Sequence, residues 1–169
     1  MNQTKVTAEP GKQEIFIVRE FDAPRDLVFK TILDPKLIPQ WWGPRYLSTL
    51  VDKMDARPGG QWRFINRDSD GKEYAFHGVY HEILAPERVI DTFEFEGLPE
   101  SGHVTLETMK LEELPGGRTR LTTQTVYQSV ADRDGTLLAG MEEGLKDTFN
   151  RLEELLAKVR EKKFSPDTP

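Results

Sequence analysis

The chain has 169 residues, a formal net charge of −6, a pI near 5.2 and no cysteine. This length suits a single domain that buries enough surface to fold without a metal or disulfides. The acidic balance argues against a general affinity for nucleic acid or for an anionic membrane surface, and the lack of cysteine excludes thiol chemistry and cysteine-ligated zinc.

Both ends of the chain are polar. We expect residues 1–12 and 161–169 to be flexible tails on either side of one domain, residues 13–160. The first twelve residues contain no apolar segment, and no stretch approaches 18 consecutive apolar residues. The sequence therefore predicts neither a signal peptide nor a membrane span, and we expect a cytoplasmic protein.

A strand and two short helices are expected at the start of the domain. Residues 14–21 read as the strand. The first helix covers about residues 24–33, because proline opens it and Asp26 lies in its first turn. The second covers about residues 34–42, and Gly43-Pro44 ends it.

Six further strands are expected between Tyr46 and Tyr127, because runs rich in aromatic and branched residues alternate with turn-forming clusters. These clusters are residues 57–60, 68–71, 85–87, 97–102 and 114–117. Residues 61–64 and 92–96 alternate polar with aromatic side chains, which places the rings on one face of each strand. The pattern indicates a seven-stranded antiparallel sheet with one face in water.

The last element is one long amphipathic helix, from Ser129 to about Arg160. Its apolar stripe consists of Met141, Leu145, Phe149, Leu152, Leu156 and Val159. Ser129 and Asp132 resemble a capping box, with aspartate in place of glutamate or glutamine. Two glycines, Gly140 and Gly144, each cost about 1 kcal/mol in a helix. Close packing, a hinge or a break in the helix would explain them; we expect a break at Gly140, with the main helix starting near Met141, and close packing at Gly144.

The element order predicts an α+β helix-grip fold: a curved seven-stranded antiparallel sheet wrapped around a long C-terminal helix, with two short helices after strand 1. Seven strands span roughly 29 Å, whereas a helix with its side chains is only about 10–12 Å across. Either large side chains fill the remaining concave space or a cavity is left there. Concave, mostly apolar cavities bind small molecules.

Several short motifs occur in this order over about residues 13–160: residues 21–29, 34–35, 41–44, 58–62, 76–80, 86–88 and 141–156. Together they resemble the Hsp90-ATPase-activator-homologue-like branch of the START/Bet v1 superfamily, also called SRPBCC or polyketide cyclase-like. The resemblance implies the helix-grip fold. It does not specify the activity, since this superfamily includes lipid carriers, hormone receptors, cyclases, ring-hydroxylase domains and cochaperone domains.

The leading hypothesis is that an apolar or aromatic small molecule binds between the sheet and the long helix, with Trp41 and Trp42 near the entrance. The alternative is that the rings simply pack as the core. Gly78 supports the cavity slightly, because a strand glycine often marks a bulge or a close approach. The candidate ligand-binding residues are Trp41, Trp42, Trp62, Phe64, Phe76, Gly78, Tyr80, Phe93, Phe95, Met141, Leu145 and Phe149.

Histidines give little indication of chemistry. His77 and His81 lie about 13 Å apart along one strand, too far to ligate one metal. Their parity is opposite to that of Phe76, so we expect both on the outer face. His103, at the start of a strand, is expected on the surface or near the cavity mouth. No HExxH, GxSxG, phosphate-loop or GxGxxG motif is present, so we expect no metal and no cofactor.

Other polar residues are divided between the two faces. Glu94 and Glu96 alternate with rings and are expected to point to solvent. Glu107, Thr108 and residues 122–125 lie on the last two strands, where half of the side chains must face inward. The threonines among them most commonly bond to the backbone or to water.

Two other functions remain open. One is a cyclase-like or hydrolytic enzyme in the same cavity, with Tyr80, His103 or an inward carboxylate as acid or base. The other is modulation of an Hsp90-type chaperone, which only the resemblance implies and which a stand-alone domain makes less favourable. A homodimer formed through edge strands is also compatible with the sequence.

Overall fold

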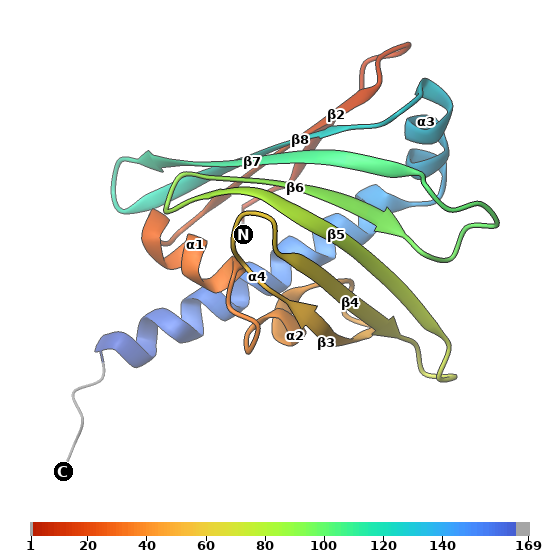
Figure 1. Ribbon diagram of the computed structural model, residues 1–169. Helices are drawn as coiled ribbons and strands as arrows, with labels where there is room; N and C mark the ends of the chain where they lie inside the picture. Colours follow the sequence, from red (N-terminus) through yellow and green to blue (C-terminus); the bar gives the residue numbers. More distant parts are fainter. Residues whose placement is uncertain (1, 165–169) are drawn as a thin grey trace.

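The computed structural model describes residues 2–164, which form an eight-stranded sheet and four helices (Figure 1). The elements in chain order are β1 (Lys5–Thr7), β2 (Glu14–Phe21), α1 (Arg25–Ile32), α2 (Ile38–Trp41), β3 (Ser48–Met54), β4 (Gln61–Arg67), β5 (Glu73–Leu84), β6 (Arg88–Phe95), β7 (Val104–Leu114), β8 (Arg118–Val126), α3 (Val130–Leu138) and α4 (Met141–Phe164). Within this part of the chain, no helix is long and apolar enough to cross a membrane.

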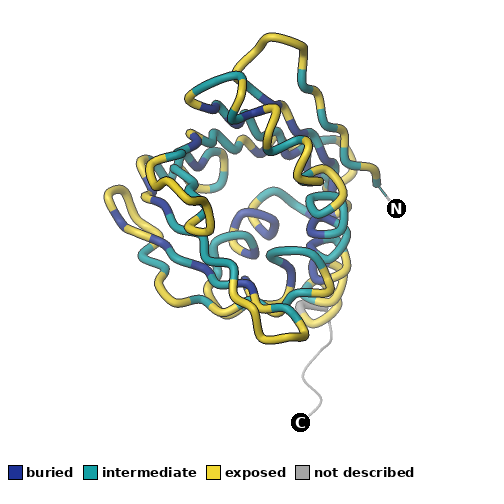
Figure 2. The backbone as a smooth tube through the Cα atoms, turned by 90° about the vertical axis from the view of Figure 1, so that its right-hand side faces the viewer, coloured by how far each residue is buried: buried dark blue, intermediate teal, exposed yellow. Residues whose placement is uncertain are grey.

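The sheet is antiparallel throughout, in the order β1-β2-β8-β7-β6-β5-β4-β3. The connection from β2 to β3 passes through α1 and α2. It runs from β2, next to one edge of the sheet, to β3 at the opposite edge. The long helix α4 lies against the concave face (Figure 1). Figure 2 shows the exposed residues concentrated on the peripheral loops. The predicted α+β helix-grip fold is confirmed.

The sheet has one strand more than the sequence predicted. The segment 1–12 is not simply a tail, because its residues Lys5–Thr7 pair with β2 and Val6 packs against the core. Asn2 Nδ2 also donates to Glu153 Oε1 on α4, at 2.6 Å. A single apolar residue in a polar segment gave no strand signal. At the other end, α4 continues past the predicted boundary at residue 160 to Phe164, and residues 165–169 lie outside the described residues.

Polar side chains fix α4 along its length. The buried guanidinium of Arg19 on β2 pairs with Glu153 and donates to Asn150 Oδ1 at 3.0 Å. Arg151 donates to the Gly43 carbonyl at 2.7 Å, just beyond the end of α2. Between these anchors Leu152 is fully buried. Because α4 is held to β2 on one side and to the α2–β3 connection on the other, its position over the concave face is defined.

The helix break expected at Gly140 is confirmed. α3 ends at Leu138 and α4 begins at Met141, and Gly140 has φ +83°, a left-handed conformation that glycine adopts at helix ends. The close packing expected at Gly144 is wrong, since an added Cβ there would meet nothing within 4 Å. Gly78 behaves differently: a Cβ there would collide with the Thr92 carbonyl and the Trp62 indole.

Gly144 and Gly78 give a matched pair of substitutions. We expect Gly144→Ala to raise the free energy of unfolding by about 0.5–1 kcal/mol, because alanine favours the helix and the space is free. We expect Gly78→Ala to lower it by about 1–3 kcal/mol, as overpacked cores do. Urea unfolding followed by circular dichroism measures both; equal effects of the two changes would contradict the difference in packing.

Candidate ligand-binding cavity

A cavity of about 1250 Å³ lies between the concave face of the sheet and the first two turns of α4. Strands β4 to β8 line it on one side, and Met141, Leu145 and Phe149 line it from the helix. Its lining includes several exposed residues, among them Tyr46, Leu98, Glu100 and Gly140. We refer to these four residues as the rim.

Aromatic rings form one wall of this cavity. Trp42 presents its edge to Phe64 and Phe76, with ring centroids 5.1 and 5.3 Å apart. Phe76 in turn stacks at a tilt on Phe93 and Phe95, at 5.3 and 5.1 Å. Edge-to-face and tilted pairs at these distances are favourable. The rings therefore stabilise one another on the wall and leave space in front of them.

Strand alternation and the apolar stripe of α4 placed most of the predicted side chains on the concave side. All the candidate ligand-binding residues line the cavity except Gly78, which lines a groove on the other face of the sheet. Trp41 does not lie at the entrance, because it is only 6% exposed and belongs to the core. The side chain of Trp41 points inward from α2. The rim residues Tyr46, on the α2–β3 connection, and Leu98 and Glu100, on the β6–β7 loop, are exposed instead.

Two carboxyl groups face the interior of the cavity. Asp91 on β6 and Glu107 on β7 are directly opposite each other in the sheet and both line the cavity. Opposite residues in an antiparallel pair have Cβ atoms about 4.5–5.5 Å apart. Among residues 2–164, the Trp62 indole is the one donor close to this pair, and its N–H does not form a hydrogen bond of normal geometry. Glu107 is among the residues that strand parity allows to face inward, whereas Asp91 was not among the predicted inward residues.

The interior position shifts the protonation of this pair. Burial raises the pKa of Glu107 to about 7. Burial, and then the neighbouring charge of Glu107, raises the pKa of Asp91 well above its usual value. The Trp62 indole lies close enough to Asp91 to oppose that shift, yet Trp62 Nε1 is buried and makes no hydrogen bond. Near neutral pH the two carboxyls therefore retain a proton that exposed carboxyls would have lost.

Two tyrosines lie near the carboxyl pair. Burial and then the charge of Asp91 raise the pKa of Tyr80. Burial is also the main cause that raises the pKa of Tyr127 to about 12. Both phenols are therefore neutral at physiological pH and are available as hydrogen-bond donors.

A histidine and an aspartate pair beside the rim. His103 Nδ1 lies 3.0 Å from Asp132 Oδ2, and this hydrogen bond raises the pKa of His103. Asp132 N donates to Ser129 Oγ at 3.0 Å, so Ser129 caps α3 as expected. The Asp132 carboxylate does not complete a capping box but binds His103 instead. His103 therefore lies near the cavity mouth, one of the two positions that the sequence allowed.

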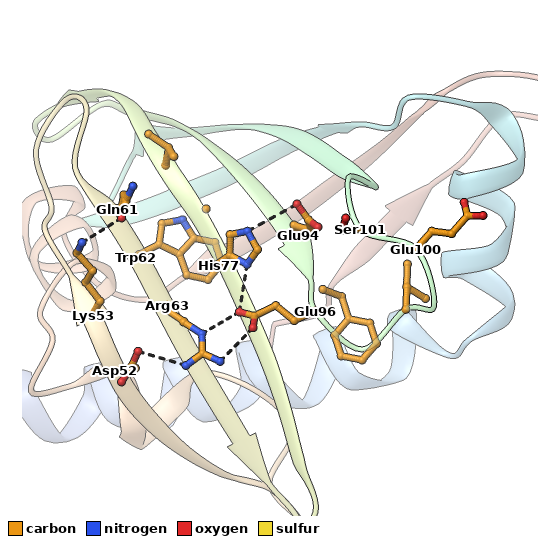
Figure 3. A pocket seen from close by; sticks show the side chains of 14 residues that line it. Asp52, Lys53, Gln61, Trp62, Arg63, His77, Glu94, Glu96, Glu100 and Ser101 are labelled. Atoms are coloured by element: carbon orange, nitrogen blue, oxygen red, sulfur yellow. Dashed lines mark hydrogen bonds and ion pairs between the residues drawn. The ribbon is translucent and has the colours of Figure 1, made fainter.

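The outer face of the sheet has a charged groove of about 540 Å³ (Figure 3). Arg63 donates to Glu96 at 2.8 and 3.0 Å and to Asp52 at 3.2 Å, and His77 Nδ1 lies 3.1 Å from Glu96. Glu94 lines the same groove, so the predicted outer placement of His77, Glu94 and Glu96 is confirmed. His81 is exposed, also as predicted. Because these charges pair with one another, the groove presents few unpaired polar groups.

Comparison with known proteins identifies the family. Residues 22–157 match the family described as "Activator of Hsp90 ATPase homolog 1-like protein". The chain belongs to this family. Like other proteins with the Activator of Hsp90 ATPase homolog 1-like fold, it has the helix-grip architecture of the SRPBCC superfamily. A search of curated proteins finds no match.

Solved structures of similar proteins agree with this assignment. An Arthrobacter aurescens protein has a TM-score of 0.82 at 26% identity, with 91% of each chain covered. Protein Ms6760 from Mycobacterium smegmatis has a TM-score of 0.78 at 26% identity, covering 91% of this chain and 96% of that one. The AHSA1 protein from Silicibacter pomeroyi, at 23% identity and a TM-score of 0.72, shares the fold over 86% of this chain and 99% of its own.

Within residues 2–164, no group of three or more histidine, aspartate or glutamate side chains is arranged to hold a metal ion. The polar groups that line the cavity include the carboxyl pair, the phenols of Tyr80 and Tyr127, and several threonines. This set can exchange hydrogen bonds and protons with a bound molecule.

The raised pKa of Glu107 predicts how stability depends on pH. A carboxyl whose pKa is higher in the folded state binds its proton more tightly there, so stability falls as pH rises from about 5 through 7. We expect Glu107→Gln to raise the free energy of unfolding by about 1–3 kcal/mol at pH 8, with a much smaller gain at pH 5.

Thermal unfolding at both pH values measures this difference. Glu112→Gln, on the exposed side of the same strand, is the control and should change stability by less than about 0.5 kcal/mol at either pH. A pH-independent effect of Glu107→Gln would show that Glu107 is ionised in the folded protein as in the unfolded one.

Proposed function

We propose that this protein binds an apolar or aromatic small molecule in the cavity between the sheet and α4. The observation that supports this most strongly is the cavity itself, because about 1250 Å³ remains after all the described side chains are in place. Ligand sites in proteins typically enclose about 300–1,000 Å³. Voids larger than a water molecule are few in a packed domain.

The chemistry of the lining favours an apolar or aromatic ligand. Rings and aliphatic side chains dominate the wall, and a small number of polar groups face the same space. Apolar contacts would supply most of the binding free energy, at about 25 cal/mol per Å² of apolar surface removed from water. The few polar groups would set the orientation of the molecule, as in other small-molecule sites.

The wall and its mouth suit entry of a ligand from one side. The rim contains exposed apolar side chains, Tyr46 at 77% and Leu98 at 45% exposure, which a passing apolar molecule can contact. The break between α3 and α4 at Gly140 lies in the same rim. Native mass spectrometry of the protein purified from its own cell extract is the direct experiment, because it detects a retained molecule of any class.

A cavity-filling substitution tests the location of the bound molecule. Thr123 on β8 lines the cavity, and Thr122 beside it faces the other side of the sheet. We expect Thr123→Phe to reduce the fraction of protein that retains the molecule at least about tenfold, because the new ring occupies ligand space. Thr122→Phe should leave retention unchanged. Equal retention in both variants would place the molecule elsewhere.

A second candidate function is acid–base catalysis on the bound molecule, of the cyclase-like or hydrolytic type. The specific observation in its favour is the carboxyl pair, since Glu107 has a pKa of about 7 and can both donate and accept a proton near neutrality. A perturbed pair of carboxyls inside a cavity is typical of catalytic sites.

Incubation of the retained molecule with fresh protein distinguishes catalysis from binding. If the pair is catalytic, the mass of the molecule or its chromatographic retention changes with the wild type, and Glu107→Gln lowers the rate by about 10²–10⁴-fold while the molecule still binds. If the molecule is recovered unchanged, the catalytic function is excluded for that molecule and the binding function stands.

A further inference from the structure

The carboxyl pair also restricts the chemistry of the ligand, given the proposed binding function. Asp91 and Glu107 both face the cavity from neighbouring strands, and the Trp62 indole beside Asp91 is the one donor near the pair among residues 2–164. Burying a carboxylate without a partner is costly, so such groups usually have an ion pair or several hydrogen bonds. Within residues 2–164 no cationic side chain pairs with the two acids, and only the Trp62 indole lies close enough to act on Asp91, so the cavity in front of the pair is where a cationic partner would fit.

Acidic groups dominate the charge of the cavity lining. Its ionisable groups are the tyrosines, His103 and five acids, namely Asp68, Asp91, Glu100, Glu107 and Asp132. Among the described lining residues there is no lysine and no arginine. Three of these acids are separate from the pair: Asp132 is bonded to His103, Asp68 caps its own turn, and Glu100 is exposed at the rim. The field inside the cavity therefore favours a cation over an anion.

The indole N–H of Trp62 is another buried polar group at this position without a well-formed hydrogen bond. Trp62 is only 4% exposed and lines the cavity beside Asp91, yet its Nε1–H has no hydrogen-bond partner. Buried indole N–H groups normally find an acceptor. If a cation ionises the pair and draws Asp91 toward itself, the same carboxylate becomes a stronger acceptor for the Trp62 N–H.

We propose that the ligand carries a protonated amine on an aromatic or apolar body, with the amine bound between Asp91 and Glu107 and the body against the ring wall. The rings support the same chemistry, because the faces of Trp and Phe attract an ammonium group within about 6 Å. Phe93 lies on β6 two residues after Asp91, and Trp62 on β4 packs against it with the ring centroids 5.9 Å apart.

Three probes with one naphthalene body test the charge preference by titration calorimetry at pH 8: 2-(1-naphthyl)ethylamine, 2-(1-naphthyl)ethanol and 1-naphthylacetate. We expect the amine to bind at least about tenfold more tightly than the alcohol, since a charge-assisted hydrogen bond contributes about 1.5–3 kcal/mol. The acetate should bind most weakly. In the double variant Asp91→Asn/Glu107→Gln the amine and the alcohol should bind alike, with the affinity for the alcohol within about twofold of the wild type.

A matched variant controls for net charge. Asp70→Asn/Glu112→Gln also removes two carboxylates, but both are exposed, so it should keep the preference for the amine. Unchanged binding of the alcohol shows that the cavity of each variant is folded. If the surface variant loses the preference as completely as the cavity variant, the pair is not the amine site.

The proton balance gives a further readout. Binding of a cation should ionise the pair, so the affinity for the amine should rise from pH 6 to pH 8 and the heat of binding should depend on the buffer; the alcohol should show neither effect. The other groups that face the pair are Tyr80 on β5 and Tyr127 on β8, which stay neutral in this range. The His103–Asp132 pair at the mouth is controlled by His103→Asn.

The outcomes separate this inference from the function on which it rests. Equal binding of amine and alcohol, or tighter binding of the acetate, would overturn the amine inference and leave a cavity that binds apolar molecules. Failure of all three probes to bind at millimolar concentration, together with no retained molecule in native mass spectrometry, would overturn both.

Discussion

The interior of this protein depends on a mismatch of width. One helix crosses the concave face of an eight-stranded sheet, and a single helix with its side chains is only about 10–12 Å across. The polar anchors Arg19–Glu153 and Arg151–Gly43 hold that helix in place and keep it from sliding across the sheet to close the gap. The space not covered by α4 is then bounded by rings that pack against one another. The cavity is thus a consequence of how the layers are held, and not of any one missing side chain.

The polar groups inside such a space are more consequential than its apolar lining. Apolar walls tolerate many molecules of suitable size, whereas a carboxyl placed where water is scarce selects strongly for what stands opposite it. Asp91 and Glu107 are one cross-strand pair, so their spacing is set by the ladder between β6 and β7 and not by flexible loops. A rigid position of this kind is what both recognition and proton transfer require.

Much of this arrangement was accessible from the sequence, because strand parity alone assigns side chains to faces. Trp62 and Phe64, Phe93 and Phe95 were placed correctly on the concave side by their alternation. Asp91 has the same parity as Phe93 and could have been found by extending that alternation two residues back along β6. It was missed because the alternation was considered only over residues 92–96, whereas the strand begins at Arg88. Depth within the fold, which gives a carboxyl its unusual proton affinity, depends on strands far apart in the sequence and has no local signal.

The errors have equally physical causes. The strand β1 carries one inward apolar residue, Val6, and its pairing with β2 is a tertiary event that short-range patterns do not record. At Gly144 the helix position was read as a contact, but the space beside it is empty. Trp41 was expected at the entrance, but α2 turns it into the core. In each case the residue type indicated a structural role, but the sequence did not show what lies next to that residue in the fold.

All three tryptophans of the chain, Trp41, Trp42 and Trp62, line the cavity. Trp62 also lines the charged groove on the opposite face (Figure 3), next to Gly78, so its indole borders both spaces. The ultraviolet emission of the whole protein therefore originates from the walls of one chamber. A ligand that enters the cavity displaces water from the tryptophan side chains themselves. The intrinsic fluorescence of the protein therefore reports whether the cavity is occupied, without any added label.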